Sequence, residues 1–284
     1  MSFDVFADID TLLVLLEITF DELAKKIGVN PSVMPKWKHN PEQISASNLK
    51  KIYTFAFENG LKLNEIKGQL AKEECPENSV VLFHGAKTNI EGEISLEKSR
   101  GTNDFGKGFY CGESLEQSAM FVAGYPESSL YITQFDKTGL SSVQFFVDRD
   151  WMLLIAYFRG KLEQYSEHPV ILELLSRLDG VDYIIAPIAD NKMFEIIDSF
   201  INGEITDIQC QHCLSATNLG NQFVFKTEKA LKQLKILKHC YLAPIEKDVY
   251  LANKQESSKI GNDKVKIARK NYRNQGLYME EIFQ

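Results

Sequence analysis

The chain has 284 residues, of which 44% are hydrophobic and 25% charged, and its formal net charge is -7. This composition is that of a globular protein with enough apolar residues for one large domain or two smaller ones. The negative charge argues against general polyanion binding, because sequence-independent affinity for nucleic acid depends on Lys and Arg that neutralise phosphates. Any contact with DNA must therefore be local.

Cysteine usage and the N-terminus indicate a cytoplasmic protein with reduced thiols. The five cysteines show no framework spacing, and the start lacks the basic residues and cleavage site of a signal peptide. The apolar stretch at residues 11–20 contains Glu17 and is too short to cross a bilayer, so no membrane contact is expected. The CQHC at residues 210–213 could bind zinc with His239 and Cys240. A single CxxC on an expected helix favours packed thiols, so no metal is assigned.

Residues 1–73 show helical periodicity, with apolar residues recurring at spacings of three and four. The pattern predicts an all-α domain of about five short helices. The stretch KEECPENS at residues 72–79, with Pro76 and a run of acidic residues, has the composition of a linker, which we place at residues 74–79.

Part of this region, TFDELAKKIGVNPSVMPKWKHNPEQISASNLKKIYTFAFENGL at residues 19–61, resembles the helix-turn-helix fold of phage-repressor-like regulators. The resemblance implies that Gly28 closes the first helix of the motif. It also implies that the core is formed by Leu23, Ala24, Ile27, Val33, Trp37 and Leu49.

The helix-turn-helix pattern leaves two functions open. A reading helix at residues 31–38 would offer only Ser32, Lys36 and Lys38 to DNA, with Pro35 in its middle. Residues 1–70 contain eight Lys, nine acidic residues and no Arg, the favoured base reader. The domain is therefore either a DNA binder through residues 20–58 or a fold kept for dimerisation or partner docking.

From residue 80 the periodicity changes, and residues 80–245 predict an α+β domain, because strands and helices mix without a regular βαβ alternation. Residues 246–284 lose the apolar pattern and regain it weakly, as expected of a C-terminal arm or docking helix. The expected strands are 79–85, 129–135, 142–147, 181–188 and 221–227. The expected helices are 114–123, 149–165, 168–178, 192–204 and 228–237.

The chemistry-bearing stretch is DFGKGFYCGESLEQSA at residues 104–119, which follows a His-Gly pair at the end of an apolar run. His84 can hydrogen-bond a sugar hydroxyl, and Gly85 allows a ligand to approach the backbone. Tyr110 offers an aromatic face for stacking. The same side chains are also common as packed or hydrogen-bonded structural residues, so the prediction rests on their occurrence together.

The residues next to Tyr110 predict a loop followed by a helix. GKG at residues 106–108 is no Walker motif, because the spacer and the following Ser or Thr are missing. SLEQ at residues 114–117 has the pattern of a capping box. The helix that it begins would turn Ala119, Phe121 and Val122 inward.

Residues 79–240 resemble a bacterial family of uncharacterised function assigned to the ADP-ribosyltransferase fold. The resemblance is carried by LFHGAK, SRGTNDFGKGFYCGESLEQSAMFVA, VDYIIAPIADNKMFEII, the helix with INGEI and NQFVFKTEKALKQLKIL. It implies a split β-sheet domain with helices, and NAD as substrate. It makes His84 a ribose-binding residue, Gly85 a carboxamide-binding residue and Tyr110 the stacking residue. The implied cofactor-binding set is His84, Gly85, Arg100, Asp104, Gly108, Phe109 and Tyr110.

The third catalytic position departs from the pattern. Poly-ADP-ribosyltransferases place a glutamate near the start of a late strand, where this chain has Gln222. An amide forms hydrogen bonds but is no base, which disfavours polymer synthesis. Transfer of a single ADP-ribose, slow NAD hydrolysis and NAD binding alone all remain open. Other carboxylates that could reach the site are Glu228, Glu246, Glu280 and Glu281.

Asp182, Asp190 and Asn191 lie at the two ends of an expected strand. They either shape the acceptor side of the site or cap the next helix and its turn, as Asp and Asn commonly do.

The function expected first is an NAD-dependent mono-ADP-ribosyltransferase-like effector of a toxin–antitoxin or phage-defence system, with a protein or nucleic-acid acceptor and a possible cognate antitoxin. The alternative is a transcriptional regulator whose degenerate domain senses NAD or another nucleotide. A scaffold with neither activity is the third possibility. Gln222 favours the transcriptional-regulator alternative, because it lacks the carboxylate of the catalytic glutamate. The few DNA-contacting residues of the expected reading helix argue against that alternative.

Overall fold

The computed structural model describes residues 3–40, 43–216 and 220–284. The chain divides into two compact units, each built from three stretches of sequence. Unit 1 consists of Met1–Gly92, Ser114–Asp136 and Lys235–Ala252. Unit 2 consists of Glu93–Glu113, Lys137–Leu234 and Asn253–Gln284. Helices precede a region of mixed strands and helices along the chain, so the predicted α+β class is confirmed.

The N-terminal part of unit 1 is helical, as its periodicity predicts. Its α-helices are α1 (Val5–Leu16), α2 (Phe20–Ile27), α3 (Met34–His39), α4 (Ala46–Glu58) and α5 (Leu63–Glu73). Asp8 of α1 is buried and accepts hydrogen bonds from Tyr53 of α4 and Lys67 of α5. One buried carboxylate therefore joins three helices.

The expected core of this helical part is largely present. Leu23, Ala24, Ile27 and Trp37 are buried, whereas Val33 and Leu49 are half-buried at its edge. Thr19 and Glu22 form a capping box at the start of α2, and Gly28 ends this helix with a φ of 64°. The local start and stop signals of α2 thus act as the sequence predicts.

Helix α3 differs from the expected reading helix at residues 31–38. It spans Met34–His39 and carries Pro35 in its first turn rather than in its middle. Proline is tolerated there, because a first-turn N–H has no partner within the helix. Ser32 and Lys36 are exposed, and the side chain of Lys38 lies outside the described residues.

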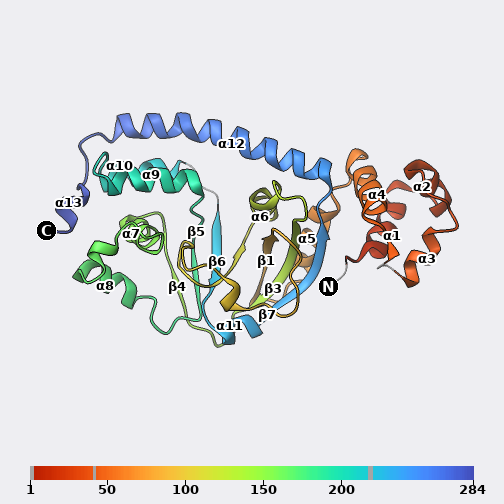
Figure 1. Cartoon of the computed structure of the whole chain (residues 1–284), viewed down its shortest axis with the longest axis horizontal. Helices are drawn as coiled ribbons and strands as arrows, with labels where there is room; N and C mark the ends of the chain where they lie inside the picture. Colours follow the sequence, from red (N-terminus) through yellow and green to blue (C-terminus); the bar gives the residue numbers. More distant parts are fainter. Residues whose placement is uncertain (1–2, 41–42, 217–219) are drawn as a thin grey trace. The chain divides into compact units, whose positions relative to one another are not determined.

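Unit 1 also contains β1 (Ser79–Ala86), β3 (Ser129–Asp136) and β7 (Leu234–Tyr241), in the order β1-β3-β7. Strands β1 and β3 are antiparallel, with His84 opposite Tyr131. Helix α6 (Leu115–Val122) packs on both of them (Figure 1).

The expected helix at residues 228–237 is wrong in its second half. Helix α11 spans only Glu228–Lys232, and the chain then forms β7. Pairing beside β3 here overrides the local helical pattern, because strand formation depends on the neighbouring strand as much as on propensity.

Four strands of unit 2 lie in the order β4-β5-β6-β2. They are β2 (Phe109–Gly112), β4 (Ser142–Gln144), β5 (Tyr183–Pro187) and β6 (Asn221–Phe225). Strands β4 and β5 are parallel, whereas β6 is antiparallel to both β5 and β2. The sequence patterns missed β2, whose four residues lie within a glycine-rich loop.

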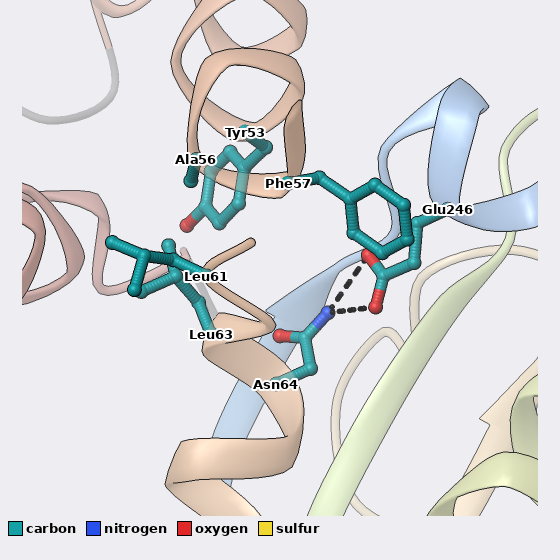
Figure 2. Close-up of a pocket in the computed structure, with 7 residues that line it drawn as sticks. All are labelled: Tyr53, Ala56, Phe57, Leu61, Leu63, Asn64 and Glu246. Atoms are coloured by element: carbon teal, nitrogen blue, oxygen red, sulfur yellow. Dashed lines mark hydrogen bonds between the residues drawn. The ribbon is translucent and has the colours of Figure 1, made fainter. Parts of the chain in front are cut away.

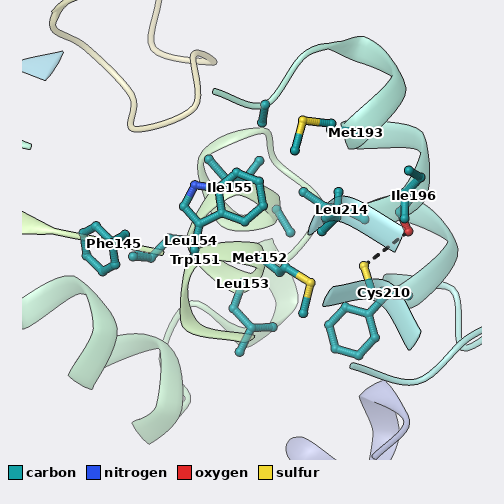
Figure 3. Packing of buried hydrophobic residues seen from close by; sticks show 14 of the residues in the cluster. Phe145, Trp151, Met152, Leu153, Leu154, Ile155, Met193, Ile196, Cys210 and Leu214 are labelled. Carbon is teal, nitrogen blue, oxygen red and sulfur yellow. Dashed lines mark hydrogen bonds between the residues drawn. The ribbon is translucent and has the colours of Figure 1, made fainter. Parts of the chain in front are cut away.

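The core of unit 2 is formed around α7 (Arg149–Phe158), α8 (Pro169–Ser176), α9 (Asn191–Ile201) and α10 (Asp207–Ser215). Figure 3 shows Trp151 and Ile155 of α7 near Met193 of α9 and Leu214 of α10. The helices bury these side chains on the faces that their apolar periodicity marks out.

The two cysteines of the CQHC sequence are packed thiols, as expected. Cys210 and Cys213 lie on α10 in the core of unit 2, and the Sγ of Cys210 is 3.6 Å from the carbonyl oxygen of Ile196 (Figure 3). Burial raises the pKa of both thiols. His239 and Cys240, considered above as further ligands, belong to unit 1.

The C-terminal residues form α12 (Pro244–Asn271) and α13 (Met279–Ile282). The first turns of α12 belong to unit 1, where Glu246 is buried. Ala268 of α12 and Met279 of α13 are buried in the core of unit 2, so this region is a packed helical segment. Among the residues that the structure describes, none of the helices is both long and apolar enough to cross a membrane.

Candidate functional site

Gln222 lies at the centre of a buried polar cluster in unit 2. Its Nε2 donates hydrogen bonds to Oδ2 of Asp104, at 2.8 Å, and to the carbonyl oxygen of Pro187, at 3.0 Å. Oδ1 of Asp104 is paired with the guanidinium of Arg159, and Oδ2 accepts a bond from the N–H of Ala189 at 3.2 Å. Gln222 and Asp104 are each 7% exposed. We call these five residues the Gln222 cluster.

The sheet register places small residues beside Gln222. Gly112 of β2 and Ala186 of β5 are its partners on the two sides. Side chains of directly opposed residues point to the same face of a sheet, and every second residue along a strand returns to that face. Tyr110 therefore lies on the face of Gln222, diagonally across from it.

Tyr110 is fixed at both its ring and its hydroxyl. The ring packs at the edge of the unit 2 core. The hydroxyl donates to the carbonyl oxygen of Gly106, at 2.7 Å, and accepts from the N–H of Phe105, at 3.1 Å. Burial raises the pKa of Tyr110, so the phenol stays protonated. Tyr110 thus shapes the loop before it, and its ring is half-buried.

Two of the other expected cofactor-binding residues are explained by packing. A Cβ on Gly108 would lie 2.8 Å from Val224 and 2.9 Å from the carbonyl oxygen of Phe225, so β6 requires glycine there. The ring of Phe109 contacts that of Phe225. Arg100 is exposed. Gly108 and Phe109 keep the loop against β6. The roles of Gly108, Phe109 and Arg100 toward a cofactor stay predictions.

His84 and Gly85 belong to unit 1. His84 is half-buried on β1, and its ring lies 6.4 Å from that of Tyr131. A Cβ on Gly85 would lie 2.3 Å from the carbonyl oxygen of Ser118 in α6. Close packing of α6 on β1 is therefore sufficient reason for glycine at position 85, where the resemblance implies contact with a carboxamide.

A family model described as "Protein of unknown function (DUF3990)" matches residues 80–236. The chain belongs to this family. No curated protein and no solved structure matches the chain. The matched residues of this DUF3990 protein include His84, Tyr110 and the whole Gln222 cluster.

Helix α6 begins as expected, after the motif that contains Tyr110. Ser114 is its N-cap and accepts a bond from the N–H of Gln117 at 3.3 Å. Ala119 and Val122 are buried, but Phe121 is 46% exposed, so its predicted inward orientation is wrong. With 3.6 residues per turn, position 121 lies away from the face that buries 119 and 122.

The acidic residues around β5 have structural partners. Asp190 caps α9 and accepts a bond from the N–H of Met193 at 2.8 Å, as predicted, and Asn191 is the first residue of that helix. Asp182 accepts bonds from the N–H of Ser141 and the hydroxyl of Thr227. The bond from Ser141 is the main reason that the pKa of Asp182 falls to about 2. These contacts hold the ends of β5.

The remaining candidate carboxylates also have local roles. Glu228 begins α11. Glu280 and Glu281 belong to the short helix α13, where Glu281 accepts a bond from the N–H of Tyr278. Glu246 is buried in unit 1, where its two oxygens each lie 3.2 Å from Nδ2 of Asn64.

Glu246 and Asn64 line a small pocket in unit 1 (Figure 2). The other lining residues are apolar or aromatic: Tyr53, Ala56, Phe57, Leu61 and Leu63. Tyr250 donates a further bond to Glu246, at 3.2 Å. Burial is the main cause that raises the pKa of Glu246, although Asn64 and Tyr250 stabilise its carboxylate. The pocket combines an apolar wall with one buried acid.

Replacing Glu246 by Gln is expected to weaken the pH dependence of stability. Because the pKa of Glu246 is raised in the folded chain, the folded state binds the proton more tightly than the unfolded state does. The contribution of Glu246 to the free energy of unfolding therefore falls as pH rises from the pKa of the unfolded chain to that of the folded chain. Urea unfolding at several pH values between about 4.5 and 8 measures this slope. The matched control is Asp248→Asn, an exposed acid on the same helix. Equal slopes for the wild type and Glu246→Gln would contradict the prediction.

Sequence patterns missed Arg159, Pro187 and Ala189 as members of the Gln222 cluster. Arg159 is the C-cap residue of α7, with an exposed fraction of 18% for its side chain. Nothing in a sequence pattern separates it from a solvated arginine at a helix end. Pro187 and Ala189 contribute backbone groups, which carry no residue-specific signal.

Proposed function

We propose that this chain binds NAD and transfers one ADP-ribose unit from it to an acceptor. The proposal starts from the ordered motifs that resemble ADP-ribosyltransferases. The structural observation that carries it is the register of β2 and β6, in which Tyr110 and Gln222 share one face of neighbouring strands. An aromatic ring and a polar amide on one face suit a ligand that has both a planar base and a sugar.

The proposed reaction makes few acid–base demands. The bond between nicotinamide and C1′ of the ribose breaks, and nicotinamide leaves with the electron pair. A nucleophile of the acceptor forms the new bond to C1′ and loses its proton. Positioning and electrostatic stabilisation of the cation-like transition state supply most of the catalysis. Gln222 can accept a hydrogen bond but carries no charge, which fits single transfer or slow hydrolysis better than polymer synthesis.

The acceptor in this proposal is a protein or a nucleic acid, and the N-terminal helices select it. An effector of this kind fits a toxin–antitoxin or phage-defence system, with a cognate antitoxin as partner. DNA contact through residues 20–58 is the alternative role of the helical part. Helix α3 has only six residues, and among its described side chains and those of the preceding turn, Ser32 and Lys36 are the exposed polar ones. These features favour docking to a partner over base readout.

The test is release of nicotinamide from NAD, and label transfer from NAD to cell extract, by the full-length chain. His84→Ala and Tyr110→Ala, taken one at a time, are each expected to lower turnover by at least about tenfold. Tyr278→Ala, at a tyrosine that is 40% exposed and directly precedes the last helix, is the matched control. Circular dichroism must show that each variant is folded. Unchanged turnover in both test variants would refute the catalytic role of these residues.

The second candidate is a regulator that binds NAD or another nucleotide without turnover. It is favoured by the Gln222 cluster, in which Asp104, the carboxylate beside Gln222, is already paired with Arg159 and poorly suited to act as a base. In that case NAD binds without nicotinamide release and changes the affinity of the full-length chain for DNA in a gel-shift assay. Turnover without DNA binding would select the transferase instead.

A further inference from the structure

The amide of Gln222 has a fixed orientation. Its Nε2 faces two groups that only accept hydrogen bonds, the carboxylate of Asp104 and the carbonyl of Pro187. Rotating the amide by half a turn would place its carbonyl oxygen against both of them and leave buried acceptors facing one another. The neighbours of Gln222 thus decide which end of the amide faces which way.

Asp104 is itself held in place by hydrogen bonds to both of its oxygens. Arg159 donates to its Oδ1 through Nε, at 3.1 Å, and through Nη2, and also donates to the carbonyl oxygen of Ala189 at 2.6 Å. The N–H of Ala189 returns a bond to Oδ2 of Asp104. Both oxygens of Asp104 thus accept hydrogen bonds from N–H groups, and they act as acceptors toward Gln222 as well.

We propose that Asp104 is a positioning residue that turns the carbonyl oxygen of Gln222 toward the ligand, and that the ligand group which meets it is a hydrogen-bond donor. The bonds of the Gln222 side chain leave from Nε2, so Oε1 is the end that a ligand can contact. A sugar hydroxyl can donate to it, whereas phosphate and carboxylate oxygens cannot. For NAD, this inference rests on the proposed function and assigns Gln222 to a ribose hydroxyl.

The arrangement also accounts for glutamine rather than glutamate at position 222. A second carboxylate there would lie about 3 Å from Asp104, where two like charges in a buried site cannot both be ionised at small cost. Exchanging the two groups removes the repulsion between residues 104 and 222, although the carbonyl of Pro187 then loses its donor. In Asp104→Asn/Gln222→Glu, the amide of residue 104 donates to the carboxylate of residue 222, and the net charge of the pair is unchanged.

The first test is a double-mutant cycle on the full-length chain, followed by thermal unfolding. Asp104→Asn and Gln222→Glu are each expected to lower the melting temperature by about 5 °C or more. The double variant should recover at least about half of the loss seen in Gln222→Glu. Recovery is partial because the N–H of Ala189 loses its acceptor and the carbonyl oxygen of Pro187 faces a carboxylate oxygen instead of a donor. Additive losses would overturn the inference. Asp150→Asn, in an exposed ion pair with Arg177, is the control.

The second test is calorimetric titration of the same variants with NAD. Gln222→Met keeps the length of the side chain but removes the acceptor, and it should weaken NAD binding by about three- to tenfold. The double variant retains an acceptor at position 222 and should bind within about threefold of the wild type. A fully folded double variant that binds as weakly as Gln222→Met would overturn the positioning role, because a merely structural pair would not restore affinity.

The two proposals fail in different ways. If the wild type binds no NAD, the proposed function is wrong, and the thermal cycle alone then decides whether Asp104 orients Gln222. If the wild type binds NAD and Gln222→Met binds it equally well, the proposed function stands and the inference about the ligand contact is wrong.

Discussion

Replacing Arg159 by Leu is expected to destabilise the chain by about 3 kcal/mol or more, because the change leaves the carboxylate of Asp104 buried without its ion-pair partner. The side chains of Arg159 and Asp104 are only 18% and 9% exposed. The variant also loses the bond from Arg159 to the carbonyl of Ala189 and the contact of its guanidinium with the ring of Phe194. Chemical denaturation of the full-length chain measures the loss.

Arg177→Leu is the matched control for this prediction. Arg177 pairs with Asp150 at 2.7 Å and also lies over an aromatic ring, that of Phe145, but the two charged side chains are 40% and 43% exposed. Water screens such a pair, and its loss is expected to cost about 1 kcal/mol or less. Adding Asp104→Asn to Arg159→Leu should restore part of the lost stability, because it removes the unpaired charge. If Arg159→Leu and Arg177→Leu lost the same free energy of unfolding, the burial of Asp104 would contribute little to the cost of breaking its ion pair.

Gly85→Ala is expected to cost about 3 kcal/mol, since its Cβ would lie 2.3 Å from the carbonyl oxygen of Ser118 and 3.0 Å from Val122. The obstructing oxygen belongs to the backbone of α6, so relief requires the helix to move away from β1. The midpoint of urea unfolding reports the effect. It must be measured before any loss of NAD binding in this variant is assigned to a carboxamide contact.

Gly124→Ala provides the comparison. Gly124 follows α6 in the same unit, and a Cβ built there meets no atom within 4 Å. We expect a change of about 0.5 kcal/mol or less. If Gly85→Ala is as stable as Gly124→Ala, packing of α6 does not explain the glycine at position 85, and the ligand-based interpretation gains weight.

The sequence predicted those parts of the fold that depend on local signals. The resemblance to a helix-turn-helix fold implied that Leu23, Ala24 and Ile27 lie in the core, which they do, and Ser114 and Asp190 start their helices as expected. Residues 234–237 were predicted as the end of a helix, because the pairing that makes them part of β7 comes from β3, roughly a hundred residues away in sequence.

In the candidate site, too, residues in local motifs could be predicted, whereas partners distant in sequence could not. Tyr110 and Gln222 were named from motifs, and they do lie on neighbouring strands. Their immediate partners could not be found that way. Asp104 and Gln222 are 118 positions apart in sequence. Arg159, which donates hydrogen bonds to Asp104, is 55 positions from it. Long-range pairs of this kind follow from the tertiary fold, so no local pattern identifies them.

The bond between Gln222 and Asp104 has a consequence for which combinations of residues this chain can accept. A glutamate at position 222 is acceptable only after position 104 has lost its charge, and a neutral residue at 104 removes the partner of Arg159. Single substitutions at these sites therefore pass through a less stable intermediate. We therefore expect positions 104, 159 and 222 of this chain to tolerate combined changes better than single ones.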